Sequence, residues 1–209
     1  MKKKTFATLF AVAAAGVLGA CSDATGVSGS GNAAMQVAAV GDDNGAAAAK
    51  APSASRAPRF ATTTASGTVD FRARVYVQTQ AGGWLELTGN AAQHAVVDAS
   101  GRAGAVVLAT SRVEAGTYAR VRVVFEEVNA SLSSSLTVST GLLSGSVSVD
   151  TQGDGNVTVE RQVAVTASAG ATSRLLINLN SDVWLNQASA TTHTVSDAAF
   201  ASAVQVTAN

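Results

Sequence analysis

Residues 68–78 read Thr-Val-Asp-Phe-Arg-Ala-Arg-Val-Tyr-Val-Gln, and apolar and polar side chains alternate along almost all of this segment. The odd positions from Val69 to Val77 are apolar, whereas the even positions include Asp70, Arg72 and Arg74. A period of two is that of a β-strand, because successive side chains of a strand point to opposite faces. The pattern therefore predicts a strand with one face in a core and the other face in water.

The chain keeps this character from Gly67 to Asn209. This stretch contains 23 valines, many threonines and serines, no proline and no lysine, a composition that suits pleated, half-buried surfaces. Further strands are expected at residues 84–88, 94–99, 104–110, 117–128, 136–139, 146–150, 157–166, 174–180 and 203–207. Nine or ten short strands with turns between them predict an all-β fold, a single antiparallel β-sandwich domain of residues 67–209, with a barrel as the alternative.

Two local features refine this expectation. Ser100-Gly101-Arg102 lies between two expected strands and contains residues favoured in turns, so it predicts a hairpin connection. Residues 196–204 could form one or two helical turns with Ser196 as the N-cap. The last strand competes with this helix for the same residues.

The N-terminus has a different composition. Three lysines follow Met1, and residues 6–20 form an apolar run without a charged side chain. The run is shorter than the roughly 20 apolar residues that a spanning helix needs. A basic start, a short apolar stretch and small residues at its end are the parts of a secretory signal peptide. We expect residues 1–20 to be such a peptide.

The only cysteine of the chain follows this run directly. Leu18-Gly19-Ala20-Cys21 resembles the bacterial lipobox, in which a leucine and two small residues precede a cysteine. The resemblance implies that Cys21 receives a diacylglyceryl group, that residues 1–20 are removed, and that the new amino group receives a fatty acid such as palmitate. Ser22, the next residue, resembles the class of lipoproteins sorted to the outer membrane. An ordinary signal peptide with a chance cysteine and a buried structural thiol are the alternatives.

Lipidation and cleavage would change the properties of the mature chain. Several acyl chains anchor a protein stably, whereas a single chain binds only marginally. Loss of the three N-terminal lysines leaves 11 basic and 14 acidic residues, a net charge of −3. No second cysteine is available for an internal disulfide, so an exported domain of this chain depends on its own core.

Residues 21–66 are expected to be the lipidated cysteine and a flexible linker. The segment from Ser22 to Arg59 is rich in Ala, Gly, Ser, Asn and Asp, lacks aromatic residues and contains both prolines of the chain. Such a segment buries too little apolar surface to offset the entropy cost of ordering. A coil of about 40 residues would reach roughly 35 Å on average. A short helix at residues 33–40 is the alternative that the sequence leaves open.

Residues 114–125, Glu-Ala-Gly-Thr-Tyr-Ala-Arg-Val-Arg-Val-Val-Phe, carry the most recognisable motif of the expected domain. A Gly-Thr-Tyr entry into a valine-rich strand resembles that of transthyretin-like and carboxypeptidase-regulatory-like sandwiches. It is also similar to a domain family of unknown function found in secreted bacterial lipoproteins, whose other strands would correspond here to residues 69–78, 84–88 and 175–184. The resemblance implies an Ig-like or transthyretin-like sandwich and transfers no catalytic residue.

This motif suggests structural roles for two residues. We expect Gly116 to supply a positive φ in the turn before the strand. We expect the Tyr118 ring to pack at the edge of the core and its hydroxyl to bond to the backbone.

Enzymatic motifs are scarce. His94 is expected in a strand and His193 in a loop, and no serine lies in a Gly-x-Ser-x-Gly elbow. Two histidines and a lipidated cysteine do not suffice for a zinc site. Scattered arginines disfavour nucleic-acid binding, and no glycine-rich phosphate loop precedes a helix. We therefore expect no catalytic residues and no cofactor.

The best metal candidate is the loop from Asp150 to Asn156. Asp150, Asp154 and Asn156 could offer three oxygen ligands to a hard cation such as calcium. The loop lacks a full calcium motif with its closing glutamate, and Asp-Gly and Gly-Asn are common turn formers. The sequence favours a hairpin tip over a metal site here.

Two further pairs of residues have both a chemical and a structural interpretation. Glu126 and Glu127 could act as an acid and a base, but neighbours on a strand point to opposite faces, so a solvated strand end is favoured. Trp84 and Trp184 could stack on sugar rings, but tryptophans in short sandwich strands favour the core or its edge.

Taken together, these features predict a protein anchored by lipid in the cell envelope, at the outer membrane, with a non-catalytic β-sandwich that serves in binding or structure. Its partners would be the membrane and an envelope glycan or another surface protein. A hydrolase of envelope polymers and a surface adhesin subunit are the alternatives. The first needs polar side chains that converge in a cleft, and the second needs an unpaired edge strand offered to a neighbour.

Overall fold

The computed structural model describes residues 31–42, 64–151 and 155–209. Within this part of the chain, eleven strands and two short helices are formed. The strands are β1 (Asn32–Val40), β2 (Gly67–Gln78), β3 (Trp84–Glu86), β4 (Gln93–Asp98), β5 (Val106–Glu114), β6 (Gly116–Val138), β7 (Gly141–Asp150), β8 (Val157–Ala167), β9 (Thr172–Asn178), β10 (Thr194–Ser196) and β11 (Gln205–Ala208). The helices are α2 (Ser181–Leu185) and α3 (Asp197–Ala203).

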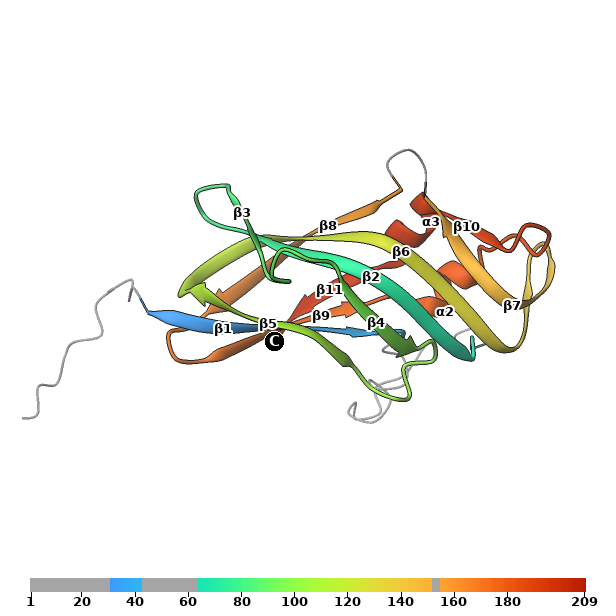
Figure 1. Cartoon of the computed structure of the whole chain (residues 1–209), viewed down its shortest axis with the longest axis horizontal. Coiled ribbons are helices and arrows are strands. Elements are labelled where there is room, and N and C mark those ends of the chain that lie inside the picture. The colour runs from blue at the N-terminus through green and yellow to red at the C-terminus, as the bar shows by residue number, and fades with distance from the viewer. Residues whose placement is uncertain (1–30, 43–63, 152–154) are drawn as a thin grey trace, which may run out of the picture.

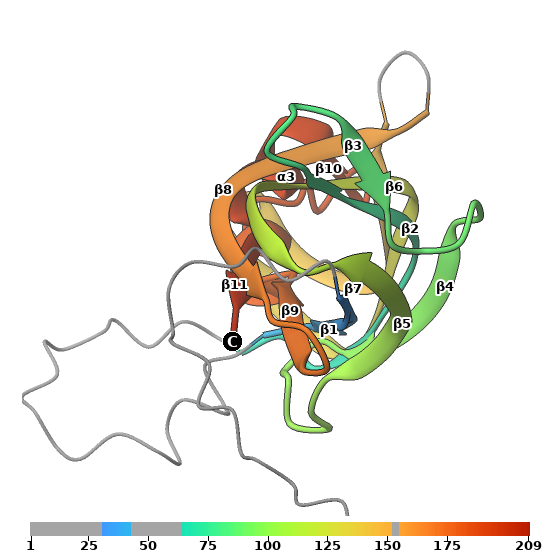
Figure 2. The same ribbon diagram turned by 90° about the vertical axis from the view of Figure 1, so that its left-hand side faces the viewer.

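The strands form two sheets that face each other across one core (Figures 1 and 2). Sheet A has four strands in the order β11-β9-β1-β5. In sheet B, β2 and β6 form the central pair, and each has two successive strands along its other side. β3 and β4 follow one another along β2, while β8 and β7 follow one another along β6. The all-β prediction is confirmed.

The sheets are mixed rather than purely antiparallel. β1 pairs in parallel with β9, and the short β10 pairs in parallel with β7. The expectation of an antiparallel sandwich was wrong at these two pairs. Each parallel pair includes a strand that the sequence pattern missed, β1 in sheet A and β10 in sheet B. Each of these strands lies beside a strand that is distant in sequence.

β1 corrects the expected boundary between linker and domain. Residues 32–40 were assigned to a linker, with a short helix as the alternative, but they form a central strand of sheet A. Met35, Val37 and Ala39 are fully buried in the core. The segment has a period of two that small alanine side chains disguise. The remainder of the expected linker lies largely outside the described residues.

Two expected hairpins are absent because the chain changes partners there. β4 pairs with β2 in sheet B whereas β5 pairs with β1 in sheet A, so Ser100-Gly101-Arg102 lies in a connection between the sheets. β7 and β8 both run antiparallel to β6, one after the other. Residues 150–156 therefore connect consecutive strands along β6, and the expectation of a hairpin tip between two paired strands was wrong.

The core is built from the valine faces of both sheets and from one aromatic chain of contacts. Phe71 and Phe125 from sheet B, Phe200 from α3 and Trp184 from α2 pack edge to face, with ring centroids 5.0–5.8 Å apart. This geometry is the one that aromatic quadrupoles prefer. The two helices therefore extend the core beyond the end of sheet A.

α3 confirms the helix expected from the sequence. The Ser196 hydroxyl accepts a hydrogen bond from the Ala199 N–H at 3.3 Å, as an N-cap does. At the other end, the Arg161 guanidinium donates to the carbonyls of Ala201 (2.6 Å) and Val204 (2.7 Å). A cation at a helix C-terminus satisfies carbonyls that lack partners within the helix, so Arg161 fastens α3 to β8. The last strand begins only after the helix ends.

Candidate functional site

The outer face of sheet B carries several ordered contacts between charged side chains. Two ion pairs lie on it, Arg74 with Glu126 (2.8 Å) and Arg122 with Glu160 (2.6 Å), and His94 forms a hydrogen bond with Asp70 (2.7 Å). The side chains of these pairs are between one third and three fifths exposed, so water screens them. They make this face polar and contribute little to the free energy of folding.

Trp84 lies at one end of this outer face. The guanidinium carbon of Arg122 is 4.1 Å from the centroid of the Trp84 ring, in a cation–π contact. Arg122 is thus held between an aromatic ring on β3 and a carboxylate on β8. Trp184, in contrast, is fully buried. The core interpretation is confirmed for Trp184, whereas Trp84 is half-buried, lies outside the core cluster and contacts Arg122.

Sequence reasoning missed the pairing of Trp84 with Arg122. The two residues lie 38 positions apart, on strands that are separated in the sheet by β2. Their side chains meet only because Gln78 pairs with Trp84 and Tyr76 pairs with Arg122. No local spacing could reveal this contact, since it depends on the register of three strands.

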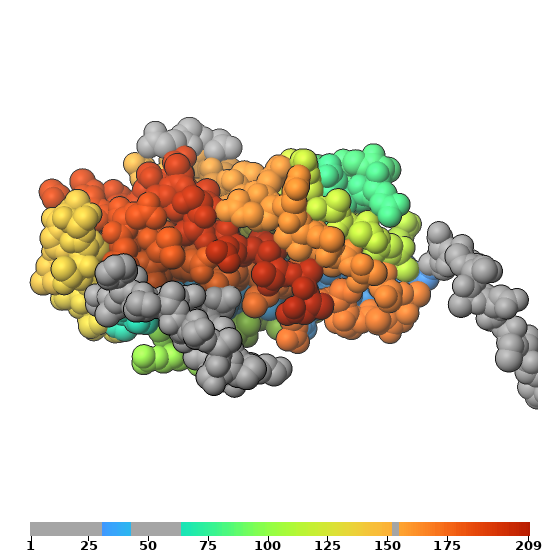
Figure 3. Space-filling model, turned by 180° about the vertical axis from the view of Figure 1, so that it is seen from behind, coloured from blue at the N-terminus to red at the C-terminus, as the bar shows by residue number. Residues whose placement is uncertain are grey.

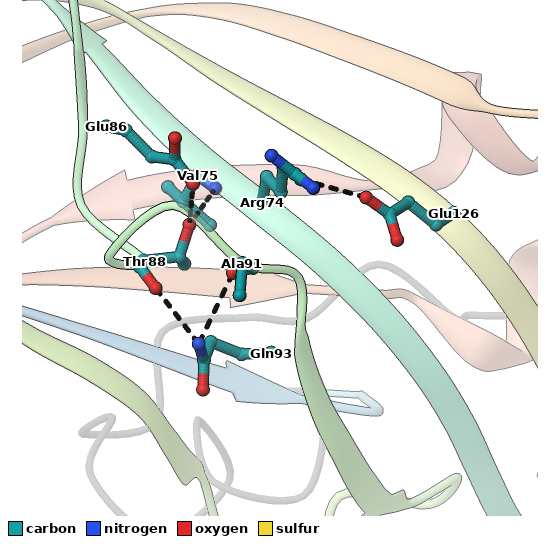
Figure 4. A network of polar contacts seen from close by, with 7 residues as sticks. All are labelled: Arg74, Val75, Glu86, Thr88, Ala91, Gln93 and Glu126. Carbon is teal, nitrogen blue, oxygen red and sulfur yellow. Dashed lines mark hydrogen bonds and ion pairs between the residues drawn. The ribbon is translucent and has the colours of Figure 1, made fainter.

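A connected set of hydrogen bonds holds the β3–β4 connection against β2 (Figure 4). The Thr88 hydroxyl accepts from the Val75 N–H at 3.3 Å and donates to Glu86 at 3.0 Å. The Gln93 side chain donates to the Thr88 carbonyl at 2.9 Å and to the Ala91 carbonyl at 3.3 Å. Thr88 is buried, so these contacts fix the connection and thereby position β3 and Trp84.

A β-bulge changes the geometry expected for Glu126 and Glu127. Arg72 pairs with Glu127 and Ala73 with Phe125, which leaves Glu126 as the extra residue in β6. Both glutamates consequently lie outside the core, between buried Phe125 and buried Val128. Both residues are in contact with solvent, as expected, but they do not point to opposite faces and they lie within β6 rather than at a strand end. Glu126 pairs with Arg74, as Figure 4 shows, and Glu127 accepts from the Asn129 side chain.

Tyr118 behaves as expected. Its ring is buried and its hydroxyl donates to the Glu114 carbonyl at 2.8 Å. Burial, and in addition the charge of Glu114, raises the pKa of the Tyr118 hydroxyl. Gly116 does not behave as expected, because it has no positive φ and a Cβ there would meet no neighbour.

Two grooves open at the end of the sandwich where β1 begins. One, of about 450 Å³, lies between the β2–β3 turn and the corner from β5 to β6, and includes Glu114 and Tyr118. The other, of about 310 Å³, lies beside Asn32 and includes Arg112 and the turn at Gly170. Both are lined mainly by small residues. The first groove is lined by two titratable residues, Glu114 and Tyr118, and the second by one, Arg112.

Asp182 is a buried carboxylate near the opposite end of sheet A. It accepts a hydrogen bond from the Ala65 N–H at 2.6 Å, which ties the segment before β2 to α2. Burial raises the pKa of Asp182; the Ala65 hydrogen bond opposes this effect, and the charge of buried Asp42 adds to it. Because α2 also bonds to the Gly41 carbonyl through Ser181, this cluster joins the ends of β1 and β9.

The residues proposed for metal binding are only partly described. Asp150 ends β7 and Asn156 precedes β8, while Asp154 lies outside the described residues. Within the described ranges, no group of three or more His, Cys, Asp or Glu side chains is placed to hold a metal ion. His94 lies in β4 and His193 in a turn before β10, as expected.

No family model, curated protein or solved structure matches this chain. The resemblance of residues 114–125 to sandwiches of secreted lipoproteins remains a prediction. Cys21 and the expected signal peptide lie outside the described residues. Among the residues that are described, neither helix has the length and apolar character needed to cross a membrane.

Proposed function

We propose that this protein is anchored by lipid on Cys21 at the cell envelope and that its β-sandwich is a non-catalytic binding or structural domain. The observation that carries the proposal is the order of features at the N-terminus: three lysines, an uncharged apolar run and Leu-Gly-Ala-Cys. Ser22 supports placement at the outer membrane. A valine-rich sandwich beginning soon after the cysteine supports a folded domain held at the lipid surface.

Cell fractionation of the Cys21→Ser variant tests the anchor. The wild-type protein is expected in the membrane fraction, and the variant is expected as uncleaved precursor or as soluble protein. Globomycin, which blocks the lipoprotein signal peptidase, should cause the wild-type precursor to accumulate. A Ser22→Ala variant is the matched control and should remain in the membrane fraction. Equal membrane association of wild type and Cys21→Ser would contradict the proposal.

The outer face of sheet B supports recognition of an envelope glycan. Trp84 offers an aromatic surface beside the guanidinium of Arg122. The carboxylates of Glu86 and Glu160 lie in the same row, because Glu86, Tyr76, Arg122 and Glu160 pair in register across the four strands β3, β2, β6 and β8. An aromatic ring with polar groups around it can stack on a sugar and bond to its hydroxyls. The hydrogen bonds at Thr88 would preorganise this surface.

Binding of envelope polysaccharides to wild-type protein and to a Trp84→Ala variant tests this surface. We expect the variant to lose retention on the polysaccharide that retains the wild type, while Leu85→Ala, a neighbouring exposed residue on β3, keeps it. If both variants bind as wild type does, Trp84 is not part of the recognition surface.

A role as a surface adhesin subunit is the second candidate, and the exposed edge of sheet A favours it. β5 ends the sheet and pairs only with β1 among the described strands. It carries exposed Val106 and Val107 and contains neither proline nor lysine, the residues that commonly protect edges. Concentration-dependent self-association that a Val107→Lys variant abolishes would support this candidate, and a monomer at all concentrations would exclude self-assembly through β5.

A further inference from the structure

The position of β1 limits the distance between the proposed lipid anchor and the folded domain, an inference that rests on the proposed function. Ten residues, 22–31, separate Cys21 from the start of β1. Whatever its conformation, such a segment spans no more than roughly 36 Å, at about 3.6 Å per residue. β6 has 23 residues and would measure roughly 70 Å if straight, at about 3.3 Å per residue. The end where β1 begins is therefore the end nearest the anchor.

Several turns gather at this end, which we call the tethered end. The Ala115 N–H donates to the Gly31 carbonyl at 2.9 Å, and the Gly170 N–H donates to the Asn32 carbonyl at 3.1 Å. The corner from β5 to β6 and the turn from β8 to β9 thus lie directly beside the start of β1. Figures 1 and 3 show the β2–β3 hairpin at this same end and the β6–β7 turn at the opposite end.

Surface charge differs in sign between the two halves of the sandwich. We divide the described residues at the bulge in β6, and call the half with the start of β1 the tethered half and the other the distal half. The register places six arginines in the tethered half: Arg74, Arg112, Arg120, Arg122, Arg161 and Arg174. Three glutamates, Glu86, Glu114 and Glu160, oppose them, so the net charge is +3.

The distal half is acidic. Its surface carries Arg72 and Arg102 against six acids, which are Asp70, Asp98, Glu126, Glu127, Asp150 and Asp197, a net charge of −4. Arg74 and Glu126 form an ion pair across the dividing line, and without this pair the halves carry +2 and −3. The buried Asp42 and Asp182 lie on the same side of the bulge. The chain as a whole carries a net charge near zero, so this polarity arises from the fold and is invisible in the composition.

Two arginines of the tethered half have no partner among the described residues. Arg112 and Arg120 are exposed, and neither guanidinium forms a hydrogen bond or an ion pair there. Arg112 also lines the groove of about 310 Å³ beside the start of β1. A guanidinium without a protein partner can form charge-assisted hydrogen bonds with phosphate oxygens.

We propose that the tethered end docks on the anionic phospholipid headgroups of the leaflet that holds the acyl chains of Cys21, with Arg112 and Arg120 facing lipid phosphates. The short tether keeps this end within reach of the surface, and the anionic surface attracts the basic half and repels the acidic one. The sandwich therefore stands with its distal half away from the membrane.

Single reporter cysteines test this orientation, since the thiol of Cys21 is consumed by lipidation. Gln80→Cys places a fluorophore in the β2–β3 turn at the tethered end, and Leu142→Cys places one on β7, where Leu142 is 64% exposed. Each mature lipidated protein is reconstituted into phosphatidylcholine vesicles, with or without phosphatidylglycerol. Lipids with a nitroxide on the headgroup then quench the fluorophores that lie near the surface.

We expect the fluorophore at residue 80 to be quenched several-fold more strongly than that at residue 142 in phosphatidylglycerol vesicles, with a smaller difference in phosphatidylcholine or at high salt. Arg112→Glu with Arg120→Glu should reduce the difference. Arg72→Glu with Arg102→Glu is the matched control, because it changes the net charge equally in the distal half, and it should preserve the difference.

Sedimentation with the vesicles separates the two levels of the proposal. Protein that does not sediment lacks the anchor, which overturns the proposed function and this inference together. Protein that sediments but shows equal quenching at both positions overturns the docked orientation alone. Equal effects of the two double variants would overturn the role of Arg112 and Arg120.

Discussion

At the scale of single residues, Tyr118 ties the start of β6 to the end of β5 through one hydroxyl. Because this hydroxyl is buried and donates to the Glu114 carbonyl, Tyr118→Phe should lower the free energy of unfolding by about 1 kcal/mol. Urea denaturation of the mature chain with Cys21→Ser measures this value. Tyr76→Phe, on the half-exposed outer face, is the control with a smaller effect. A Tyr118→Phe protein as stable as wild type would contradict the account of this contact.

The same residue predicts a pH dependence at alkaline pH. The folded-state pKa of Tyr118 is raised above its ordinary value of 10.0, so the folded state holds the proton more tightly than the unfolded state does. This contribution to stability is present below the unfolded pKa and is lost as the pH rises through the folded pKa. Thermal melts above about pH 10 should therefore show a fall in stability that is smaller in Tyr118→Phe.

Asp182 predicts a pH dependence in the acidic range. Its folded-state pKa is raised above the ordinary 3.8, chiefly by burial, so its contribution favours folding below the unfolded pKa and is lost as the pH rises through the folded value. In Asp182→Asn the amide oxygen can still accept from the Ala65 N–H. The variant should lose the part of the stability decline above about pH 4 that this carboxyl causes. Identical pH profiles of the variant and wild type would contradict the assignment.

Residue roles could be predicted where they depend on local geometry and not where they depend on register. Tyr118 sits at the start of its strand in a motif that fixes its own surroundings. The contact of Trp84 with Arg122 was missed because it depends on β2 and β6, and the orientation of the two glutamates of β6 was misjudged because a bulge altered the alternation. Gly116 is a residue type that is common in turns, but its φ is not positive, so its conformation does not require glycine.

At the scale of elements, β1 is the strand where the structure differs most from the sequence prediction, because a segment expected to be a linker forms part of the core. Met35 is fully buried between the sheets, so Met35→Ala should lower the free energy of unfolding by about 2–5 kcal/mol. Gln36→Ala, its neighbour on the outer face of the strand, should cost much less. Chemical denaturation of both variants measures the difference. No effect of Met35→Ala would mean that residues 32–40 are a linker after all.

The connection between β4 and β5 offers a second test at this scale. Gly101 has a φ of 70°, and a Cβ there would collide with the Asp42 carbonyl, whereas Gly104 has a φ of 81° and open space around it. Alanine at Gly104 should cost about 1–2 kcal/mol for the left-handed backbone alone. Alanine at Gly101 should cost clearly more because the collision adds to the same backbone cost. Equal losses would show that the connection does not pack on the end of β1.

Elements could be predicted from the sequence where their side-chain pattern was strong. The alternation of residues 68–78 predicted β2 nearly to its ends, and Ser196 predicted the start of α3. β1 was missed because its alanines and its glycine-rich neighbourhood weaken the alternating pattern. Its partners in sheet A are also distant in sequence, so no local pairing signal marks it. The expected hairpins were wrong because the alternation of side chains predicts where strands lie but not which strands pair with each other. Here the pairing depends on how the two sheets pack together.

At the scale of the whole molecule, the sandwich combines a short connection to Cys21 with an uneven distribution of charge. The fold places the start of β1 among turns that share the end of the sandwich with unpaired arginines. An anchor of several acyl chains and a basic end would act in the same direction, since hydrophobic insertion holds the protein and headgroup phosphates orient it. In the proposed orientation the outer face of sheet B would lie sideways to the membrane, with β3 and Trp84 toward the tethered end.

The mass of the N-terminal peptide of the protein from membranes tests this account most directly. We predict a peptide that begins at Cys21 and carries a diacylglyceryl group on sulfur and a fatty acyl group on the amino nitrogen. A peptide that begins at Cys21 or elsewhere without these groups, or an uncleaved N-terminus in the membrane-bound protein, would contradict the anchor on which the proposed function and the orientation both depend.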